Sequence, residues 1–418
     1  MKAYKVATTG KNLNSEIELP ASKSISNRLL VMRALEKSKV LFNNLSEAED
    51  TYMMRLYLSS INTCADSHIP MVIDAHNAGT VFRFLTAYLA QKEGKWLVTG
   101  SERMKLRPVE ELVNSLRNLG ADIEYIEKEG FPPLIIKGKK LSGGTVEMNA
   151  SASSQYVSAL MLIAPHLNNG LTIQLKGKPV STSYIDMTAK LMSDFLIKTE
   201  QKDSTIHIPH GHYFIRKITV EPDWSSAAFW YQMVSMKKES VVFLPGLREN
   251  SVQGDRFLAE VFKSLGVNSE FSSQGVQLTH SGNIKTSIDY DFSNAPDIVP
   301  SVMSACAALG VKAKFSGIEH LRIKESDRIA TMEEELGKLG ATITKASNSY
   351  ILEPGNKKVS EITFNSHGDH RIAMCLAPMA LKYSTVIISD PDVVAKSYPY
   401  YWDDLKKSKI FNLQLIEE

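Results

Sequence analysis

The 418-residue sequence contains little cysteine and no long apolar run. Cys64, Cys306 and Cys375 lie far apart and lack the CxxC spacing of a metal or redox motif, so we expect reduced thiols without a chemical role. No apolar segment approaches the roughly 20 residues of a membrane span, and the first residues do not resemble a signal peptide. The formal net charge of +2 gives no reason to expect a nucleic-acid or membrane partner. We therefore expect a cytoplasmic protein.

The length and the 43% hydrophobic content exceed what one core usually holds, which predicts two domains. Apolar helix candidates recur along the chain, and the last five begin at intervals of about 73 residues. Each of the six candidates begins with small or polar residues: Ser22-Lys23-Ser24, Asn77-Ala78-Gly79-Thr80, Ser151-Ala152-Ser153-Ser154-Gln155, Asp223-Trp224-Ser225-Ser226, Pro296-Asp297 and Asp369-His370-Arg371. The first interval is shorter, so we expect a trimmed first unit.

Amphipathic helices follow the apolar ones, over 109–119, 257–265 and 329–339. A glycine stands after the last apolar turn of each, which predicts that the third helix includes Leu265 and ends at Gly266. Short β-like runs complete the units. A helix that is apolar nearly all round belongs inside a domain, which predicts three units per domain around buried helices.

Cations and hydroxyl groups gather at the predicted helix starts. Helix N-termini present unpaired N–H groups and a positive dipole end, so several that converge would bind anions. Lys23 and Arg28, Arg83, and Arg371 each lie at such a start. Ordinary capped helices with solvated cations remain the alternative. The charged runs 103–108 and 322–328 have the same two interpretations.

Two cofactor-type motifs can be tested against the spacing of the residues. The Lys23-Ser24 pair lacks the glycines of a nucleotide-binding P-loop, which would fall at Ile17 and Ser22. A metal-hydrolase pattern around His367 and Asp369 would need another histidine where Asn365 stands. We therefore predict no metal and no cofactor.

Taken together, the helix starts and charged runs resemble the enolpyruvyl transferase superfamily in order and spacing over nearly the whole chain. The most specific segments are Ser22 to Arg28, Asn77 to Thr80, Arg103 to Pro108, Ser153 to Gln155, Lys324 to Arg328 and Asp369 to Arg371. The resemblance implies an α/β fold, a two-domain inside-out α/β barrel in which each domain has three βαβαββ-type units around buried helices. The domains would be 21–222, and 1–20 plus 223–418, which close on substrates held between them.

Within the superfamily, the resemblance is to the members that transfer the enolpyruvyl group of phosphoenolpyruvate to the 5-hydroxyl of shikimate 3-phosphate, the target of the herbicide glyphosate. It implies contacts with shikimate 3-phosphate from Lys23, Ser24, Arg28, Ser153, Ser154, Gln155, Ser181, Asp297 and Lys324. It implies contacts with phosphoenolpyruvate from Lys23, Gly79, Arg107, Gln155, Arg328, Arg371 and Lys396. Both substrates are small molecules, and we expect a monomer.

The catalytic residues implied are Asp297 at the acceptor hydroxyl and Lys23 with Glu325 at the carbon-side proton transfers. Which of the latter two delivers that proton stays open. Three positions depart from the family pattern: His76, Phe84 and His320. They leave glyphosate sensitivity and one substrate contact undecided.

Two rival functions can be weighed against the sequence. The sister enzyme that uses UDP-N-acetylglucosamine typically carries a cysteine in the loop matching 103–108, and this loop has none. A phosphometabolite-binding protein without activity would not need an acid–base set such as Lys23, Asp297 and Glu325.

Overall fold

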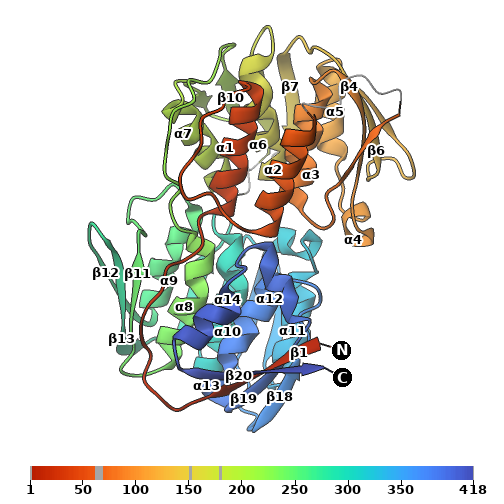
Figure 1. Cartoon of the computed structure of the whole chain (residues 1–418). Helices are drawn as coiled ribbons and strands as arrows, with labels where there is room; N and C mark the ends of the chain where they lie inside the picture. Colours follow the sequence, from red (N-terminus) through yellow and green to blue (C-terminus); the bar gives the residue numbers. More distant parts are fainter. Residues whose placement is uncertain (1, 62–68, 150–152, 178–180, 418) are drawn as a thin grey trace. The chain divides into compact units, whose positions relative to one another are not determined.

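The computed structural model describes residues 2–61, 69–149, 153–177 and 181–417. The chain divides into two compact units (Figure 1). Unit 1 comprises Met1–Ala21 and Glu221–Glu418, and unit 2 comprises Ser22–Val220. No helix in the described ranges combines the length and the apolar character needed to cross a membrane.

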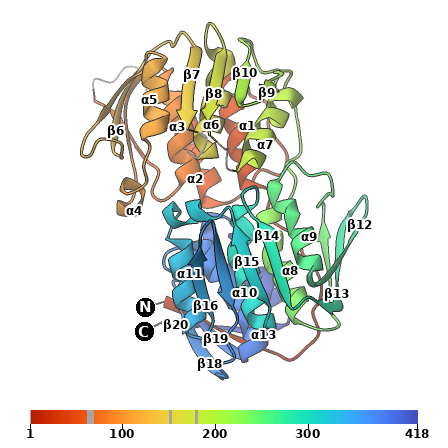
Figure 2. The same cartoon turned by 180° about the vertical axis from the view of Figure 1, so that it is seen from behind.

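The described residues of unit 2 form two four-stranded sheets, each with helices against it (Figure 2). Its helices are α1 Lys23–Leu35, α2 Glu49–Ile61, α3 Gly79–Ala90, α4 Glu102–Lys105, α5 Glu110–Asn118, α6 Ser154–Ile163, the 3-10 turn η1 Ala164–His166 and α7 Thr182–Asp194. Its strands are β3 Met71–Asp74, β4 Gly94–Thr99, β5 Asp122–Tyr125, β6 Leu134–Gly138, β7 Gly144–Asn149, β8 Leu171–Lys176, β9 Glu200–Lys202 and β10 Thr205–Ile208.

Unit 1 contains three four-stranded sheets. Its helices are α8 Trp224–Met236, α9 Leu258–Lys263, α10 Val299–Leu309, α11 Arg328–Gly337, α12 His370–Leu376, α13 Ala380–Tyr383 and α14 Tyr401–Lys407, with 3-10 turns η2 Gly254–Phe257, η3 Pro296–Ile298, η4 Glu319–Ile323, η5 Ala377–Met379 and η6 Pro391–Lys396. Its strands are β1 Lys2–Thr8, β2 Asn14–Glu16, β11 Val241–Pro245, β12 Leu265–Phe271, β13 Gly275–Ile284, β14 Ser287–Asp291, β15 Lys312–Ser316, β16 Thr342–Ala346, β17 Ser349–Glu353, β18 Glu361–Phe364, β19 Thr385–Ser389 and β20 Phe411–Glu417.

One strand pattern recurs in four of the five sheets that the described residues form. Two parallel strands are joined through an apolar helix, and a hairpin or its equivalent completes the sheet, as in the orders β3-β4-β6-β5, β7-β8-β10-β9 and β14-β15-β17-β16. A parallel pair needs such a crossover connection, which explains why α3, α6, α10 and α12 each lie between two paired strands. The fifth sheet differs, because its parallel strands β2 and β11 are separated in sequence by the whole of unit 2. The repeating units predicted from the sequence are therefore present.

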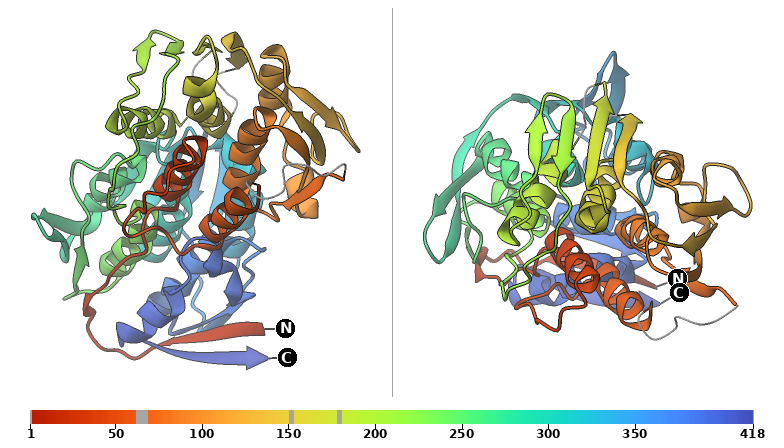
Figure 3. Two further views of the ribbon diagram at one scale, coloured as in Figure 1. Left: turned by 45° about the horizontal axis from the view of Figure 1, so that its top comes forward. Right: turned by 90° about the horizontal axis from the view of Figure 1, so that it is seen from above.

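The N-terminal segment completes two sheets of unit 1. Strand β2 pairs in parallel with β11, and β1 lies between β19 and β20, antiparallel to both. Figure 3 shows β1 and β20 side by side at the two ends of the chain. By contrast, the stretch from Ser22 to Ile61 contains α1 and α2 but no strand, only an isolated bridge between Asn43 and Thr219. The first repeat is thus shorter, as predicted.

The apolar helices form the centre of each unit. In unit 1, α8 and α10 are buried along almost their whole length, and they pack against each other and against α12. In unit 2, α1, α3 and α6 contact one another in the same way. Helices without a polar face can be accommodated only where sheets and other helices cover them on all sides. The amphipathic helices α5 and α11 lie where the sequence predicted helices.

The predicted end of the third amphipathic helix is wrong. Helix α9 stops at Lys263, and Leu265 and Gly266 belong to β12. The strand register shifts between Leu265 and Val267, and Gly266 has a φ of 86°. Glycine therefore accommodates a β-bulge here instead of ending a helix.

The central helices should carry most of the stability of each unit. Leu160 in α6 is fully buried, whereas Leu56 in α2 is largely exposed. We expect Leu160→Ala to lower the free energy of unfolding by about 2–5 kcal/mol through lost burial and a cavity. Leu56→Ala should change it by no more than about 0.5 kcal/mol. Urea denaturation followed by circular dichroism measures both, and equal losses would contradict this assignment of the core.

Candidate functional site

The starts of two central helices of unit 2, α3 and α6, are linked by side-chain hydrogen bonds. Gln155, in the first turn of α6, accepts a hydrogen bond from Arg83 Nη1 at 2.9 Å and donates to Thr80 Oγ1 at 3.3 Å. Thr80 and Arg83 both belong to the first turns of α3. The side chain of Ser153 caps α6 by accepting from the backbone N–H of Gln155. The N-termini of α3 and α6 are therefore held together.

Gly79 lets two guanidinium groups approach the start of α3. A Cβ atom at this position would lie 2.2 Å from Arg83 Nη1 and 2.9 Å from Arg107 Nη2. Both arginines are buried, and Arg107 Nη1 lies 3.5 Å from the carbonyl oxygen of Asn77. A side chain at residue 79 would therefore displace these guanidinium groups from the positions that they occupy here.

Arg83 is a buried cation that no carboxylate of the described residues neutralises. Its contacts are the Gln155 hydrogen bond and the face of the Tyr156 ring at 5.3 Å, and its Nε is buried without a hydrogen-bond partner. A buried charge without a counterion is costly. Together with Arg107 and the positive end of the α3 dipole, Arg83 makes this site suited to an anion.

The two cations in the first turns of α1, Lys23 and Arg28, have different kinds of partner. Lys23 forms an ion pair with the buried Asp50, with Nζ and Oδ2 2.9 Å apart. Arg28 is buried and donates to Thr188 Oγ1 at 2.7 Å, to Ser158 Oγ at 3.0 Å and to the backbone carbonyl of Ser24 at 2.9 Å. Burial lowers the pKa of Arg28 to about 10, so it is charged at neutral pH. Arg28 therefore connects α1 with α6 and α7.

Two further serines predicted to bind substrate also lie at helix starts. Ser154 is the buried first residue of α6, and Ser181 immediately precedes α7. Ser181 has a φ of 55°, a left-handed conformation that is uncommon for a residue other than glycine and that occurs often at functional sites.

In unit 1, a single arginine binds three carboxylates. Arg328, only 2% exposed, donates to Asp369 at 2.8 Å, to Glu325 at 2.9 Å and to Asp297 at 3.1 Å. Burial by itself would lower the pKa of Arg328, but the three carboxylates raise it above its ordinary value. Asp369 also caps α12 by accepting from the N–H of Arg371. The starts of α10, α11 and α12 are thus joined through Arg328.

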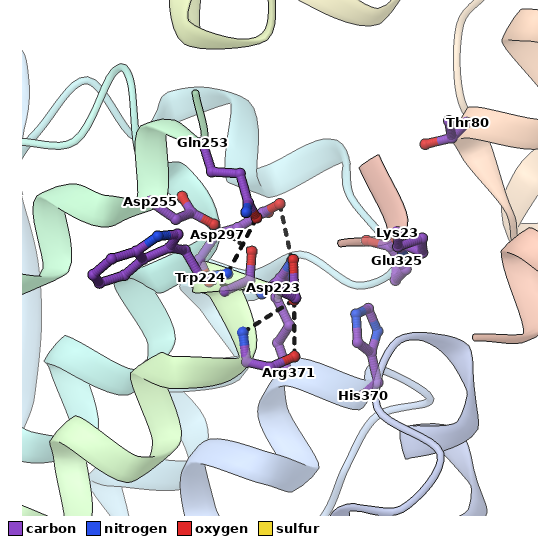
Figure 4. A network of polar contacts seen from close by, with 12 residues as sticks. Lys23, Thr80, Asp223, Trp224, Gln253, Asp255, Asp297, Glu325, His370 and Arg371 are labelled. Carbon is purple, nitrogen blue, oxygen red and sulfur yellow. Dashed lines mark hydrogen bonds and ion pairs between the residues drawn. The ribbon is translucent and has the colours of Figure 1, made fainter. Parts of the chain in front are cut away.

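Asp297 lies between two arginines. Its Oδ2 is 3.0 Å from Arg371 Nη2, and Arg371 Nη1 donates to the Asp297 backbone carbonyl at 3.2 Å. Figure 4 shows Asp297 and Arg371 with Asp223 and Asp255 nearby. Asp297 is not sealed off, because its side chain keeps 17% of its exposure. It is therefore a carboxylate fixed in orientation that a ligand can still reach.

Asp255 is a buried carboxyl group that sequence reasoning did not single out. It accepts a hydrogen bond from Ser225 Oγ. The pKa of Asp255 is raised to about 7, mainly by burial. The negative charges of Asp297 and Asp223 also raise this pKa, whereas the positive charge of Arg371 lowers it. Nothing in the segment Gln253-Gly254-Asp255 signalled this position.

The remaining predicted residues of unit 1 belong to η4, η6 and the segment before α11. His320 is half-buried. Desolvation, and after it the nearby positive charge of Lys324, lowers the pKa of His320 to about 3, so the imidazole is neutral at pH 7. Its Nε2 has no hydrogen-bond partner. Lys396, which by default would be exposed, is buried at the end of η6.

The structure adds three residues to those named as ligands. Asp50 and Asp369 neutralise predicted cations, and Asp255 lies beside Asp297. Asp369 stands inside a motif that the sequence had marked, so its charge was a usable signal. The partners of Asp50 and Asp255 are distant in sequence and could not be read from it.

The raised pKa of Asp255 predicts a pH dependence of stability. An ordinary aspartate in the unfolded chain titrates near 4, so between about pH 4 and 7 the folded state binds the extra proton. The contribution of this group to stability is present at low pH and is lost as the pH rises toward 7. Asp255→Asn should therefore gain thermal stability relative to the parent between pH 5 and pH 7.5. A constant difference in melting temperature across that range would contradict the assignment.

Comparison with known proteins gives consistent results. The family model of EPSP synthase (3-phosphoshikimate 1-carboxyvinyltransferase) matches residues 7–405. The chain is 43% identical over 410 residues to the 3-phosphoshikimate 1-carboxyvinyltransferase of Bacteroides fragilis, covering 97% of this chain and 98% of that protein. It is 34% identical to the corresponding protein of Colwellia psychrerythraea, covering 94% and 96% of the two chains.

The fold is also found among solved structures. EPSP synthase from Acinetobacter baumannii superimposes with a TM-score of 0.77 over the full length of both chains, at 21% sequence identity. The mixed α/β fold predicted from the sequence is thereby confirmed. With a family model that spans almost all of its residues and relatives that match it from end to end, the chain belongs to the EPSP synthase (3-phosphoshikimate 1-carboxyvinyltransferase) family.

Proposed function

We propose that this chain transfers the enolpyruvyl (carboxyvinyl) group of phosphoenolpyruvate to the 5-hydroxyl of shikimate 3-phosphate and releases inorganic phosphate. Family membership supports the reaction. The structural observation that carries the proposal is the pair of buried guanidinium groups, Arg83 and Arg107, at the start of α3. Each substrate carries a carboxylate and a phosphate, which charge-assisted hydrogen bonds from such groups recognise.

The residues of unit 2 supply mainly anion binding. Gly79, Arg107 and Gln155 are assigned to phosphoenolpyruvate, and the cluster that they form with Arg83 supports this assignment. Shikimate 3-phosphate is assigned to the hydroxyl-bearing helix starts and the cations of α1, namely Lys23, Ser24, Arg28, Ser153, Ser154, Gln155 and Ser181. Arg28 donates to protein groups in this structure, so we assign it the positioning of α1 as well.

The residues of unit 1 supply the proton transfers and the remaining cations. Asp297 accepts the proton of the attacking hydroxyl, and Glu325 with Lys23 serves the carbon-side transfers. Attack at the carbon that bears the phosphate ester, with protonation of the methylene carbon, gives a tetrahedral intermediate. Loss of phosphate and of a methyl proton then completes the reaction. Lys324, Arg328, Arg371 and Lys396 are assigned to the substrates' negative groups.

Because the reaction breaks a C–O bond and moves protons, side chains suffice, and the proposal includes no cofactor. Both sets of residues are assigned to one catalytic cycle on the strength of family membership. We further propose a cytoplasmic monomer that acts on these small molecules.

Arg107→Ala should weaken the affinity for phosphoenolpyruvate much more than the affinity for shikimate 3-phosphate. Loss of a charge-assisted contact to phosphoenolpyruvate costs about 1.5–3 kcal/mol, or roughly a 10- to 150-fold weaker affinity. Affinity for shikimate 3-phosphate should change less than about threefold. Isothermal titration with each ligand measures both effects, with Lys137→Ala, an exposed lysine of β6, as the control. Equal losses for the two ligands would refute the division of the binding residues.

Asp297→Ala should separate binding from turnover. Removal of a general base typically lowers kcat about 10²- to 10⁴-fold. We expect that loss in phosphate release, with shikimate 3-phosphate binding retained. The matched control is Asp289→Ala in β14, whose carboxylate forms only an exposed ion pair with Lys314. Turnover at the parent rate in Asp297→Ala would exclude this residue as the base.

A further inference from the structure

A second cluster of polar side chains lies in unit 2, at the end of α1 opposite to Lys23. Glu36 is the C-terminal cap residue of α1, His166 ends η1 directly after α6, and His212 lies in the segment that follows β10. His166 Nε2 is 2.8 Å from Glu36 Oε1, and His212 Nδ1 is 3.3 Å from Glu36 Oε2. The three ligand atoms lie within 4.8 Å of one another. None of these residues takes part in the proposed reaction.

The cluster has the composition of a transition-metal site. Two imidazole nitrogens and one carboxylate are the protein ligands of zinc sites that leave the fourth position to water. Bonds of about 2.0–2.2 Å to a tetrahedral ion keep the ligand atoms about 3.4 Å apart, close to the contacts formed here. Nitrogen ligands favour zinc and its neighbours over magnesium or calcium, which prefer oxygen.

The charge around Glu36 agrees with a bound cation. Its other contact is the backbone N–H of Tyr213 at 2.6 Å, and no lysine or arginine in the described ranges pairs with it. A similar group in unit 1 differs in this respect. There Glu335, close to His367, is already neutralised by Lys338 at 2.7 Å. In the first group, by contrast, the one carboxylate has no lysine or arginine partner among the described residues.

We propose that Glu36, His166 and His212 bind a divalent ion of the zinc type. Binding replaces the two histidine–carboxylate contacts with bonds to the ion, and each imidazole coordinates through a ring nitrogen that carries no proton. The ion joins the end of α1, the turn after α6 and the segment after β10. It therefore braces α1 and α6 at the ends opposite to the residues assigned to substrate, and its role is structural.

Metal titration of the full-length protein, free of any polyhistidine tag and stripped with EDTA, tests this proposal. Zinc chloride should bind at one equivalent in calorimetry, and magnesium chloride should not bind at this site. At zinc concentrations about 100 times Kd, the melting temperature of unit 2 should rise by about 5–10 °C. Cobalt(II) should give visible absorption bands that zinc removes.

His212→Gln is the informative variant because this side chain is 72% exposed and its loss leaves the fold intact. We expect the melting temperature of His212→Gln in EDTA to match that of the parent. Its Kd for zinc should rise by at least about 10- to 100-fold, which is the cost of losing a residue that only orients a metal ligand. His207→Gln is the matched control, since this exposed histidine of β10 contacts only Thr172. The proposal fails if no saturable zinc binding occurs, if magnesium binds equally well, or if His212→Gln and His207→Gln bind zinc with the same affinity.

Discussion

A buried helix with no polar face can contact a polar ligand only at its ends. In both units, three such helices pack against one another and are covered by sheets, so their sides are unavailable to any ligand. Their N-termini carry unpaired N–H groups and the positive end of the helix dipole. This constraint explains the positions of the assigned side chains at the starts of α1, α3, α6, α10 and α12, whereas Ser181 and Arg328 lie at the starts of α7 and α11.

The two units differ in how their buried arginines are neutralised. In unit 2, Arg83 is buried without a carboxylate, and the cluster gains most when an anion arrives. In unit 1, Arg328 is neutralised within the protein by Asp297, Glu325 and Asp369. An ion pair buried with all its hydrogen bonds is tolerated, whereas an isolated charge is costly. The arginine cluster of unit 2 can therefore bind an anion directly. Arg328 of unit 1 must first give up contacts with its own carboxylates.

The sequence predicted the repeating units well because their signals are local. Apolar helices with polar starts and a 73-residue recurrence require no knowledge of distant contacts, and α3, α6, α8, α10 and α12 begin where expected. The exception is Gly266, which was predicted to end a helix but lies in a β-bulge. The positive φ of this glycine suits both a helix end and a bulge, so the sequence could not distinguish them. The pairing of β2 with β11 depends on residues more than 200 positions apart and left no local trace.

The site was predicted less completely, for a related reason. Charge type and helix position identified the cations, but the groups that neutralise them come from elsewhere in the chain. The pairing of Lys23 with Asp50 and the burial of Asp255 beside Asp297 depend on tertiary packing. Arg28 shows the limit most clearly, because the same arginine at a helix start suits either a ligand contact or the internal bonds to Ser158 and Thr188 that the structure contains.

The exchange of partners at Arg328 links substrate binding to proton transfer. On the proposed function, a negative group of the substrate takes over part of the guanidinium that now serves Asp297 and Glu325. A carboxylate that loses a cationic neighbour holds a proton more tightly and becomes a better base. Binding would then activate the two carboxylates assigned to proton transfer only when an anion is in place. The residue that joins the starts of α10, α11 and α12 is, on this view, also the one that prepares the acid–base groups.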